Sequence, residues 1–246
     1  MTYQAAIARY LKRNGHTSFP LKAVLFDMDG VLFNSMPYHA EAWHKAMQRH
    51  GLDLSREEAY LHEGRTGSDT IGIVYQRQYG KQPTAEEIKT IYADKCAEFT
   101  VYPEPEPVEG VNELLQMIKN DGLIRMVVTG SGQPALINRL THSFPGIFQR
   151  ELMITAFDVQ QGKPNPEPYL KALRKAGLQP NEAIVVENAP MGVQAGASAG
   201  IFTVAVNTGP INGQLLTAAG ADLLFESMQV FANEWDKIYK EARRAM

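Results

Sequence analysis

The 246-residue sequence has a single cysteine, no block of basic residues and no apolar run of the roughly 18 residues that a membrane span requires. Because Cys96 has no second cysteine to pair with, an internal disulfide is excluded, which fits a reducing compartment. The N-terminus also lacks the apolar stretch of a signal peptide. The formal net charge of −3 disfavours nucleic acid or an anionic membrane as a partner. We therefore expect a cytoplasmic protein that binds neither nucleic acid nor membrane.

Apolar residues make up 44% of the chain and charged residues 21%, as in a globular protein with a sizeable core. In the second half of the chain, segments with the pattern of buried strands alternate with segments of helical periodicity. This alternation predicts an α/β fold, a doubly wound, Rossmann-like parallel sheet with helices on both faces. The expected strands are residues 23–26, 124–128, 152–155, 183–186, 202–206 and 223–225, and the expected helices are residues 2–13, 37–50, 68–79, 111–120, 134–141, 166–176 and 192–199.

A mostly helical block, residues 36–105, separates the first expected strand from the next, and a proline-rich hinge at 102–110 ends it. We therefore predict an α/β core domain formed by residues 21–35 and 106–246, with the helical block inserted as a second domain. Residues 1–20 are predicted to form a helical extension. This extension either packs on the core or mediates oligomerisation, so a monomer and a homodimer both stay open.

The stretch from Leu21 to Ser35 contains the first candidate site. Its apolar strand ends in Asp27 and Asp29, and strand ends are where ligands bind in open α/β sheets. Because side chains alternate along an extended chain, both carboxylates can face one substrate while Met28 points away. Asp27, ionised at neutral pH, suits a nucleophile that forms an aspartyl-phosphate. Asp29 is placed to give a proton to the leaving oxygen and later to take one from water.

The segment from Asp27 to Ser35 resembles the first motif of the haloacid dehalogenase superfamily, in its phosphatase and phosphomutase branch. The resemblance implies phosphoryl transfer on a small phosphorylated substrate. Thr129 and Gly130, at a later strand end, are similar to the second motif of the family, with Ser131 following them. Their hydroxyl and backbone amide groups are expected to bind a phosphoryl oxygen.

The third and fourth motifs of that family are also matched. Lys163 stands where the family has a cation, which offsets the repulsion between the nucleophilic Asp27 and a phosphoryl dianion. Glu187 and Asn188 stand where the family normally has two acids. The resemblance implies Mg²⁺ as the cofactor, with oxygen ligands expected from Asp27, Glu187, Asn188 and the main-chain carbonyl of Asp29.

The inserted helical block resembles the small helical cap of the β-phosphoglucomutase branch, most closely from Ser35 to Trp43. His39 matches a histidine that those enzymes keep near the leaving oxygen. We therefore expect His39 to contact the substrate and to assist Asp29.

The loop from His62 to Gly67 departs from the mutases of that branch. The mutases have a lysine where Glu63 stands, an arginine where Gly67 stands, and a lysine just after the second motif, where this chain has Gly132 and Gln133. A mutase must retain a doubly phosphorylated intermediate, which requires strong cationic groups at both ends. The differences in this loop therefore favour a hydrolase.

Glu63 is expected to reach the Mg²⁺ or its waters when the cap closes, and Arg65 to bind a second phosphoryl group. Such a pocket fits inorganic pyrophosphate, which is the leading substrate prediction. β-Phosphoglucomutase and sugar-phosphate phosphatase activities stay open as alternatives, whereas phosphonate hydrolysis requires a cap lysine where Glu63 stands. A non-catalytic phosphate-binding module is an alternative of a different class, which the presence of Asp27, Asp29 and Lys163 disfavours.

Overall fold

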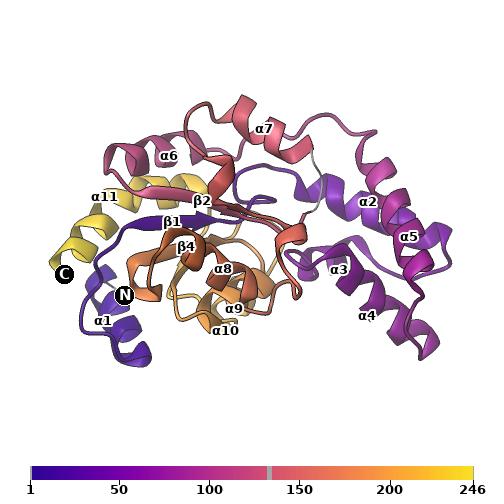
Figure 1. Ribbon diagram of the computed structural model, residues 1–246, viewed down its shortest axis with the longest axis horizontal. Coiled ribbons are helices and arrows are strands. Elements are labelled where there is room, and N and C mark those ends of the chain that lie inside the picture. Colours follow the sequence, from indigo (N-terminus) through magenta and orange to yellow (C-terminus); the bar gives the residue numbers. More distant parts are fainter. Residues whose placement is uncertain (1, 132–134, 246) are drawn as a thin grey trace.

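The computed structural model describes residues 2–131 and 135–245, and within these residues six strands form one parallel sheet (Figure 1). Their spatial order is β3-β2-β1-β4-β5-β6, which confirms the predicted α/β, doubly wound, Rossmann-like fold class. The strands are β1 (Ala23–Phe26), β2 (Ile124–Val128), β3 (Met153–Ile154), β4 (Ala183–Glu187), β5 (Phe202–Val206) and β6 (Leu223–Phe225). The strand expected at 152–155 is shorter than predicted, because Leu152 belongs to a 3-10 turn, Arg150–Leu152.

Strand β1 lies at the centre of the sheet, with β2 and β4 as its neighbours. The register pairs Phe26 with Val127 on one side and with Val186 on the other, so the carboxyl ends of the three strands lie nearly level. Because all of these strands run in the same direction, the residues that follow them meet at one edge of the sheet. This edge is where the candidate site is expected.

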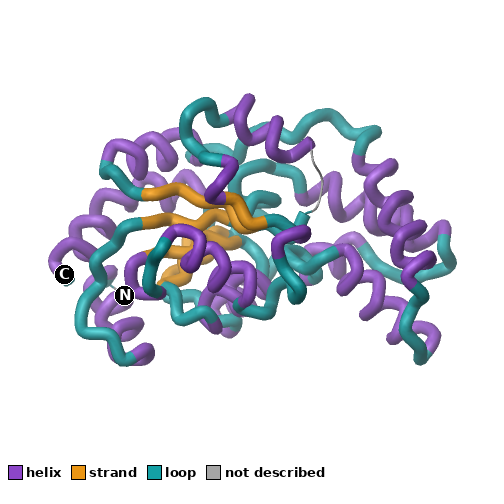
Figure 2. Tube along the Cα trace, viewed as in Figure 1, coloured by secondary structure: helices purple, strands orange, loops and turns teal. Residues whose placement is uncertain are grey.

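Alternate residues of the strands pack into apolar clusters on the two faces of the sheet. Val24 and Phe26 join residues of α1, α6 and α11, whereas Ala23 and Leu25 join residues of α8 and α9. Figure 2 shows the strands as a layer between helices. Burial on both faces explains why the strands are continuous apolar runs. The helices of the core are α1 (Tyr3–Asn14), α6 (Val111–Asn120), α7 (Ala135–Ser143), α8 (Glu167–Ala176), α9 (Pro190–Ser198), α10 (Gly213–Ala218) and α11 (Met228–Arg244).

Two of these helices, α10 and α11, are absent from the elements expected from the sequence. Helix α11 is long and amphipathic, with Trp235 and Ile238 fully buried on one face. Among the described residues, no helix combines the length and the apolar character that crossing a membrane requires.

Helices α2 to α5 lie beyond the carboxyl edge of the sheet and have an apolar cluster of their own (Figure 1). Their bounds are α2 (Met36–Arg49), α3 (Arg56–Leu61), α4 (Gly67–Tyr79) and α5 (Ala85–Phe99). The reciprocal hydrogen bonds between Thr84 and Glu87 form a capping box at the start of α5. We refer to residues 36–105 as the cap. The division of the chain into this cap and a core of residues 21–35 and 106–246 stays a prediction.

Helix α1 packs on the core of its own chain, which is one of the two possibilities that the sequence leaves open. Tyr10 is fully buried, donates its hydroxyl to the carbonyl of Gly200 at 2.9 Å, and has its ring centre 5.4 Å from that of Phe202. Arg13 forms two hydrogen bonds with the buried carboxylate of Asp222, at 2.9 and 3.1 Å. The N-terminal helix is therefore an integral part of the α/β core.

Replacement of Tyr10 by alanine should lower the free energy of unfolding by about 3–5 kcal/mol, because a large buried aromatic side chain is lost. The matched control is Tyr79→Ala in the cap, where the tyrosine is 46% exposed and the expected loss is about 1 kcal/mol or less. Urea denaturation followed by circular dichroism measures both values. Equal losses in the two variants would contradict the packing described for α1.

Candidate active site

A small pocket lies where the carboxyl edge of the sheet meets the cap. Its cavity volume is about 60 Å³, and its wall includes Asp27 and Asp29 from the core and Glu63 and Arg65 from the cap. Met28, between the two aspartates, is fully buried in the apolar core instead. The alternation predicted for the end of the first strand is therefore confirmed, and both carboxylates face one cavity.

Lys163 is the buried cation of this site, with 1% of its side chain exposed. Its Nζ donates to Oδ1 of Asp27 at 2.5 Å, to Oε1 of Glu187 at 2.6 Å and to the carbonyl of Val128 at 2.9 Å. Tyr169 donates its hydroxyl to the same oxygen of Glu187 at 2.6 Å. Burial acts to lower the pKa of Lys163, but the two carboxylates outweigh burial and raise this pKa above its usual value. The amine is therefore protonated at neutral pH.

The carboxyl groups near Lys163 outnumber its one ammonium group, and they belong to Asp27, Asp29, Glu63 and Glu187. Burial, together with the charges of Glu187 and Asp29, raises the pKa of Asp27 to about 7, even though Lys163 acts in the opposite direction. Burial raises the pKa of Glu63 well above its usual value, and the charge of Asp27 adds to this effect. A buried site with this excess of acids favours a further cation.

Asp29 is held by a chain of buried polar groups. Its Oδ1 accepts a hydrogen bond from the Ser35 hydroxyl at 2.6 Å and lies 3.1 Å from Nε2 of His39, whose Nδ1 is 2.8 Å from Nζ of Lys95. Because an ammonium group only donates, Nδ1 accepts from Lys95, which places the proton of a neutral ring on Nε2, toward Asp29.

The pKa values in this chain follow from burial and hydrogen bonding. Burial and the charge of Lys95 lower the pKa of His39, which keeps the ring neutral near pH 7. Burial lowers the pKa of Lys95 itself to about 8. For Asp29, burial acts to raise the pKa, but His39 and Ser35 outweigh it and lower the pKa to about 2. The charge interaction with His39 is the largest of the effects that lower this pKa, followed by the hydrogen bonds from His39 and Ser35, and Asp29 is ionised.

The cap loop of residues 62–66 reaches the core at the fourth motif. Glu63 is 7% exposed, and its Oε1 accepts a hydrogen bond from Nδ2 of Asn188 at 2.9 Å. The other oxygen of each side chain, Oε2 of Glu63 and Oδ1 of Asn188, is buried and has no hydrogen-bond partner among the described residues. Arg65 contacts the sulfur of Met191 through Nη2 at 3.0 Å. The loop therefore bridges the cap and the core at the pocket.

The residues of the second motif line the pocket directly after β2. Thr129 is 5% exposed, and its hydroxyl accepts a hydrogen bond from the amide of Ser131 at 3.0 Å. Gly130 lies between them on the pocket wall. Gly132 and Gln133, which stand where the mutases have a lysine, lie outside the described residues.

All site residues predicted from the sequence lie in or beside the pocket. Those on its wall are Asp27, Asp29, His39, Glu63, Arg65, Thr129, Gly130 and Ser131. Lys163 and Asn188 donate hydrogen bonds to the wall residues Asp27 and Glu63, and Glu187 lies behind the wall, where it accepts a hydrogen bond from Lys163. The catalytic and binding roles given to them stay predictions. Sequence reasoning missed Lys95 and Tyr169, because no local motif marks them and Lys95 is 56 positions from its partner His39.

The arrangement of donors bears on the predicted Mg²⁺ site. Among residues 2–131 and 135–245, no three His, Cys, Asp or Glu side chains converge as a metal site. The predicted ligands also include an amide and a main-chain carbonyl, however, and the unpartnered oxygens of Glu63 and Asn188 are hard donors of the kind Mg²⁺ prefers. Both oxygens of Glu187 already accept hydrogen bonds, from Tyr169 and Lys163 on Oε1 and from the amide of Asn188 on Oε2 at 3.2 Å. The residues fit Mg²⁺, with Glu187 better placed to hold Lys163 than the metal.

Comparisons with known proteins agree with this geometry. A family model described as haloacid dehalogenase-like hydrolase matches residues 24–206. Hexitol phosphatase A of Escherichia coli (strain K12) is 34% identical over 76% of this chain and 83% of its own length. Validoxylamine A 7'-phosphate phosphatase of Streptomyces hygroscopicus subsp. limoneus is 32% identical over 76% of this chain and 86% of its own. Among solved structures, a Bacteroides vulgatus protein provisionally described as a beta-phosphoglucomutase is 58% identical, covers 98% of each chain and has a TM-score of 0.96.

In metal-free protein, Asp27 and Glu63 should act to lower the thermal midpoint Tm as the pH rises from about 5 to about 8. His39 and Lys95, whose pKa values are lowered, act in the opposite direction. Asp27 has a pKa of about 7 in the folded state, compared with about 3.9 in an unfolded chain. The folded state therefore binds more protons in this window and loses stability as they dissociate. Glu63, whose pKa is also raised, acts in the same direction.

This pH dependence can be measured by thermal denaturation in EDTA at several pH values for the wild type, Glu63→Gln and the exposed control Glu57→Gln. The Tm of Glu63→Gln relative to that of the wild type should rise as the pH increases across this range, because the variant lacks the Glu63 proton, and the relative Tm of the control should stay constant. If all three proteins had the same pH dependence, the raised pKa of Glu63 would be wrong.

Proposed function

This chain belongs to the haloacid dehalogenase-like hydrolase family, and on that premise we propose that it is a phosphatase that cleaves a small phosphorylated substrate through an aspartyl-phosphate, with Mg²⁺ as cofactor. The observation that carries the proposal is Asp27 at the end of the central strand, held 2.5 Å from the buried ammonium of Lys163. A carboxylate in this position needs no separate base to attack phosphorus. Lys163 limits the repulsion between this carboxylate and the phosphoryl group.

In the first step, an oxygen of Asp27 forms a bond to phosphorus while the bond from phosphorus to the leaving oxygen breaks. Asp29 gives the leaving oxygen its proton. Because the pKa of Asp29 is lowered to about 2, this carboxyl must first take up a proton, which a protonated phosphate substrate can supply.

In the second step, water attacks the phosphorus of the aspartyl-phosphate and the bond to Asp27 breaks. Asp29 takes the proton of this water, a role that its ionised form suits. Ser35 and His39 orient the carboxylate for both steps through hydrogen bonds to Oδ1.

Asp27, Asn188, Glu63 and the main-chain carbonyl of Asp29 are the groups that would hold Mg²⁺. When bound, the ion would supply positive charge to the phosphoryl group during transfer. The buried oxygens of Glu63 and Asn188 that have no hydrogen-bond partner among the described residues support this assignment.

A sugar phosphate is the substrate class that the relatives support. Two of the proteins compared above are named Hexitol phosphatase A and Validoxylamine A 7'-phosphate phosphatase, and the third is provisionally described as a beta-phosphoglucomutase. None of these three is named a pyrophosphatase. A sugar phosphate therefore stands ahead of the inorganic pyrophosphate that sequence reasoning places first.

Inorganic pyrophosphate stays the second candidate, because the pocket is small. A cavity of about 60 Å³ holds on the order of four to six waters. Arg65 lies on its wall with a buried Nε that has no partner among the described residues, so it can bind a second phosphoryl group. At Gly67, a Cβ would lie 2.4 Å from ring carbons of Tyr92, which leaves little room for the arginine of the mutases.

Asp27→Asn should lower kcat by at least about 10³-fold, because the nucleophile is replaced by a neutral amide. Steady-state release of phosphate measures this loss, and a single cooperative thermal transition shows that the variant is folded. Full activity in a folded Asp27→Asn protein would rule out the aspartyl-phosphate mechanism.

The substrate class can be tested with a panel of hexitol phosphates, hexose 6-phosphates, β-glucose 1-phosphate and pyrophosphate, all with Mg²⁺. We expect kcat/KM of about 10⁴ M⁻¹s⁻¹ or more for one sugar phosphate, with release of phosphate. A clear lead for pyrophosphate would replace the first candidate by the second. Conversion of β-glucose 1-phosphate to glucose 6-phosphate would instead identify a mutase.

For the leading substrate, Glu63→Ala should lower kcat/KM by about tenfold or more, because in the proposed mechanism Glu63 would help to hold the metal beside the reacting phosphoryl group. The matched control is Glu57→Ala on the exposed side of α3, which should leave kcat/KM unchanged. No effect of Glu63→Ala would remove this residue from the site.

A further inference from the structure

The cap loop of residues 62–66 rests directly on two glycines of the core, Gly130 and Gly162. A Cβ on Gly130 would lie 2.6 Å from the carbonyl oxygen of Gly64. A Cβ on Gly162 would lie 2.7 Å from Cγ2 and 3.0 Å from the amide nitrogen of Thr66. Contacts of carbon with heavy atoms are favourable only at about 3.5–4.0 Å. The loop therefore occupies the space that a side chain at either position would need.

Neither of these two glycines is required by its own backbone. The positive φ angles that favour glycine occur nearby, at Gly30 (79°) and Gly64 (84°), but not at Gly130 or Gly162. An alanine can adopt the local backbone at both positions. The close approach of the cap loop is thus the feature that demands glycine there.

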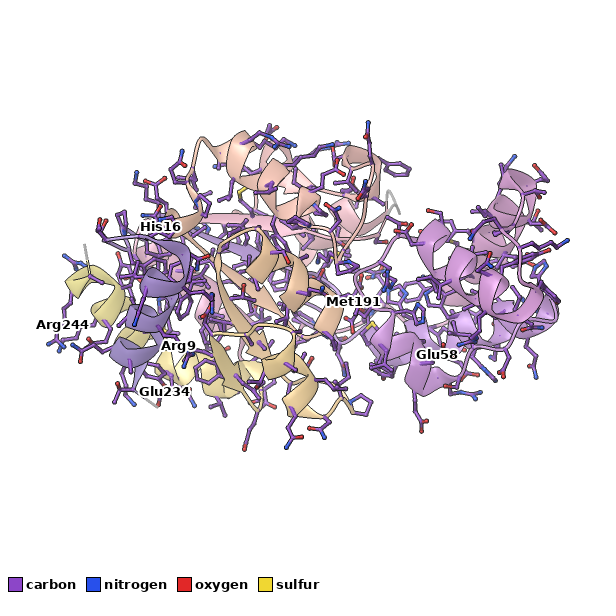
Figure 3. All side chains as sticks on the ribbon, turned by 90° about the horizontal axis from the view of Figure 1, so that it is seen from below. Arg9, His16, Glu58, Met191, Glu234 and Arg244 are labelled. Carbon is purple, nitrogen blue, oxygen red and sulfur yellow. The ribbon has the colours of Figure 1, made fainter. Side chains whose placement is uncertain are left out.

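The same contact sets how deeply the loop enters the core. With the loop in this position, Glu63 lies 2.9 Å from Asn188, and Arg65 lies 3.0 Å from the sulfur of Met191. Figure 3 shows Met191 where the core meets the cap. The space that remains between cap and core is the cavity of about 60 Å³.

We propose that Gly130 and Gly162 determine the largest leaving group that the pocket accepts, because they allow the cap loop to close directly onto the core. This inference rests on the proposed phosphatase function and deepens it: among the phosphorylated substrates that the pocket accepts, those with a smaller leaving group should react faster than those with a bulkier one. A methyl group at either position must displace the loop by roughly 0.5 Å or more. That displacement enlarges the cavity and lengthens the hydrogen bond between Glu63 and Asn188.

The primary test compares Gly162→Ala with the wild type on glycerol 1-phosphate, a compact substrate, and glucose 6-phosphate, a larger one, both with Mg²⁺. We divide kcat/KM for glycerol 1-phosphate by kcat/KM for glucose 6-phosphate. In Gly162→Ala this ratio should fall by about tenfold or more, because a displacement of catalytic or binding groups by about 1 Å already affects catalysis strongly. Gly130→Ala should change the ratio in the same direction. The matched control is Gly72→Ala in α4, where the nearest atom to the new Cβ is 3.4 Å away and the ratio should not change.

Hydrogen exchange of the loop amides gives a second readout that needs no substrate. Residues 63–66 should exchange faster in Gly162→Ala and Gly130→Ala than in the wild type and in Gly72→Ala. Thr66→Ser, added to Gly162→Ala, should partly restore slow exchange because it removes the Cγ2 atom that clashes. The serine keeps the hydroxyl that accepts from the amide of Asp69 at the start of α4.

An unchanged substrate ratio together with unchanged exchange, in variants whose Tm shows them to be folded, would overturn the inference. In another outcome, hydrogen exchange changes as expected although the wild type hydrolyses none of the phosphorylated substrates. The proposed phosphatase function would then be wrong, whereas the role of the two glycines in seating the cap loop on the core would be supported. If Gly162→Ala alone does not fold, Gly130→Ala and the variant that combines Gly162→Ala with Thr66→Ser provide the same two readouts.

Discussion

The ion cluster around Lys163 is the interaction on which the rest of the site depends. Two carboxylates, Asp27 and Glu187, are buried at neighbouring strand ends, and removing each from water costs several kcal/mol unless a cation compensates. The ammonium group of Lys163 contacts both and also a strand carbonyl, so it ties β1, β2 and β4 together at their carboxyl edge. Gly192 supports this arrangement, because a Cβ there would lie 1.9 Å from Oε1 of Glu187.

The sequence was sufficient to predict the strands and the residues that gather at their ends, because both follow from local pattern and from the rule that parallel strands end at one edge. Asp27, Thr129 and Lys163 come from distant segments, yet the register of the sheet brings them together. Tyr169 and Lys95 could not be predicted, since their roles depend on how a helix face packs against the site. The depth of the cap loop, and hence the pocket volume, also depends on tertiary packing.

The core and the cap contribute differently to function. In the proposed mechanism, the core supplies a nucleophile, a cation and hydrogen-bond donors to the phosphoryl oxygens that suit any phosphate, which agrees with relatives of different named substrates sharing the family fold. The cap supplies Glu63 and Arg65, whose placement limits what else fits beside the phosphoryl group. On the proposed mechanism, substrate choice depends on a few contacts between the cap loop and the core, and the comparisons favour a sugar phosphate.

The central claim is that Asp27 becomes phosphorylated during turnover. The most direct measurement is rapid acid quenching of the Asp29→Asn variant with an excess of p-nitrophenyl phosphate, whose leaving group needs no proton, followed by mass spectrometry of the peptide that contains residues 21–35. Without the base that activates water, the account predicts that a phosphoryl group accumulates on Asp27. Catalytic turnover by this variant with no phosphorylated peptide, or with the phosphoryl group on another residue, would contradict the account.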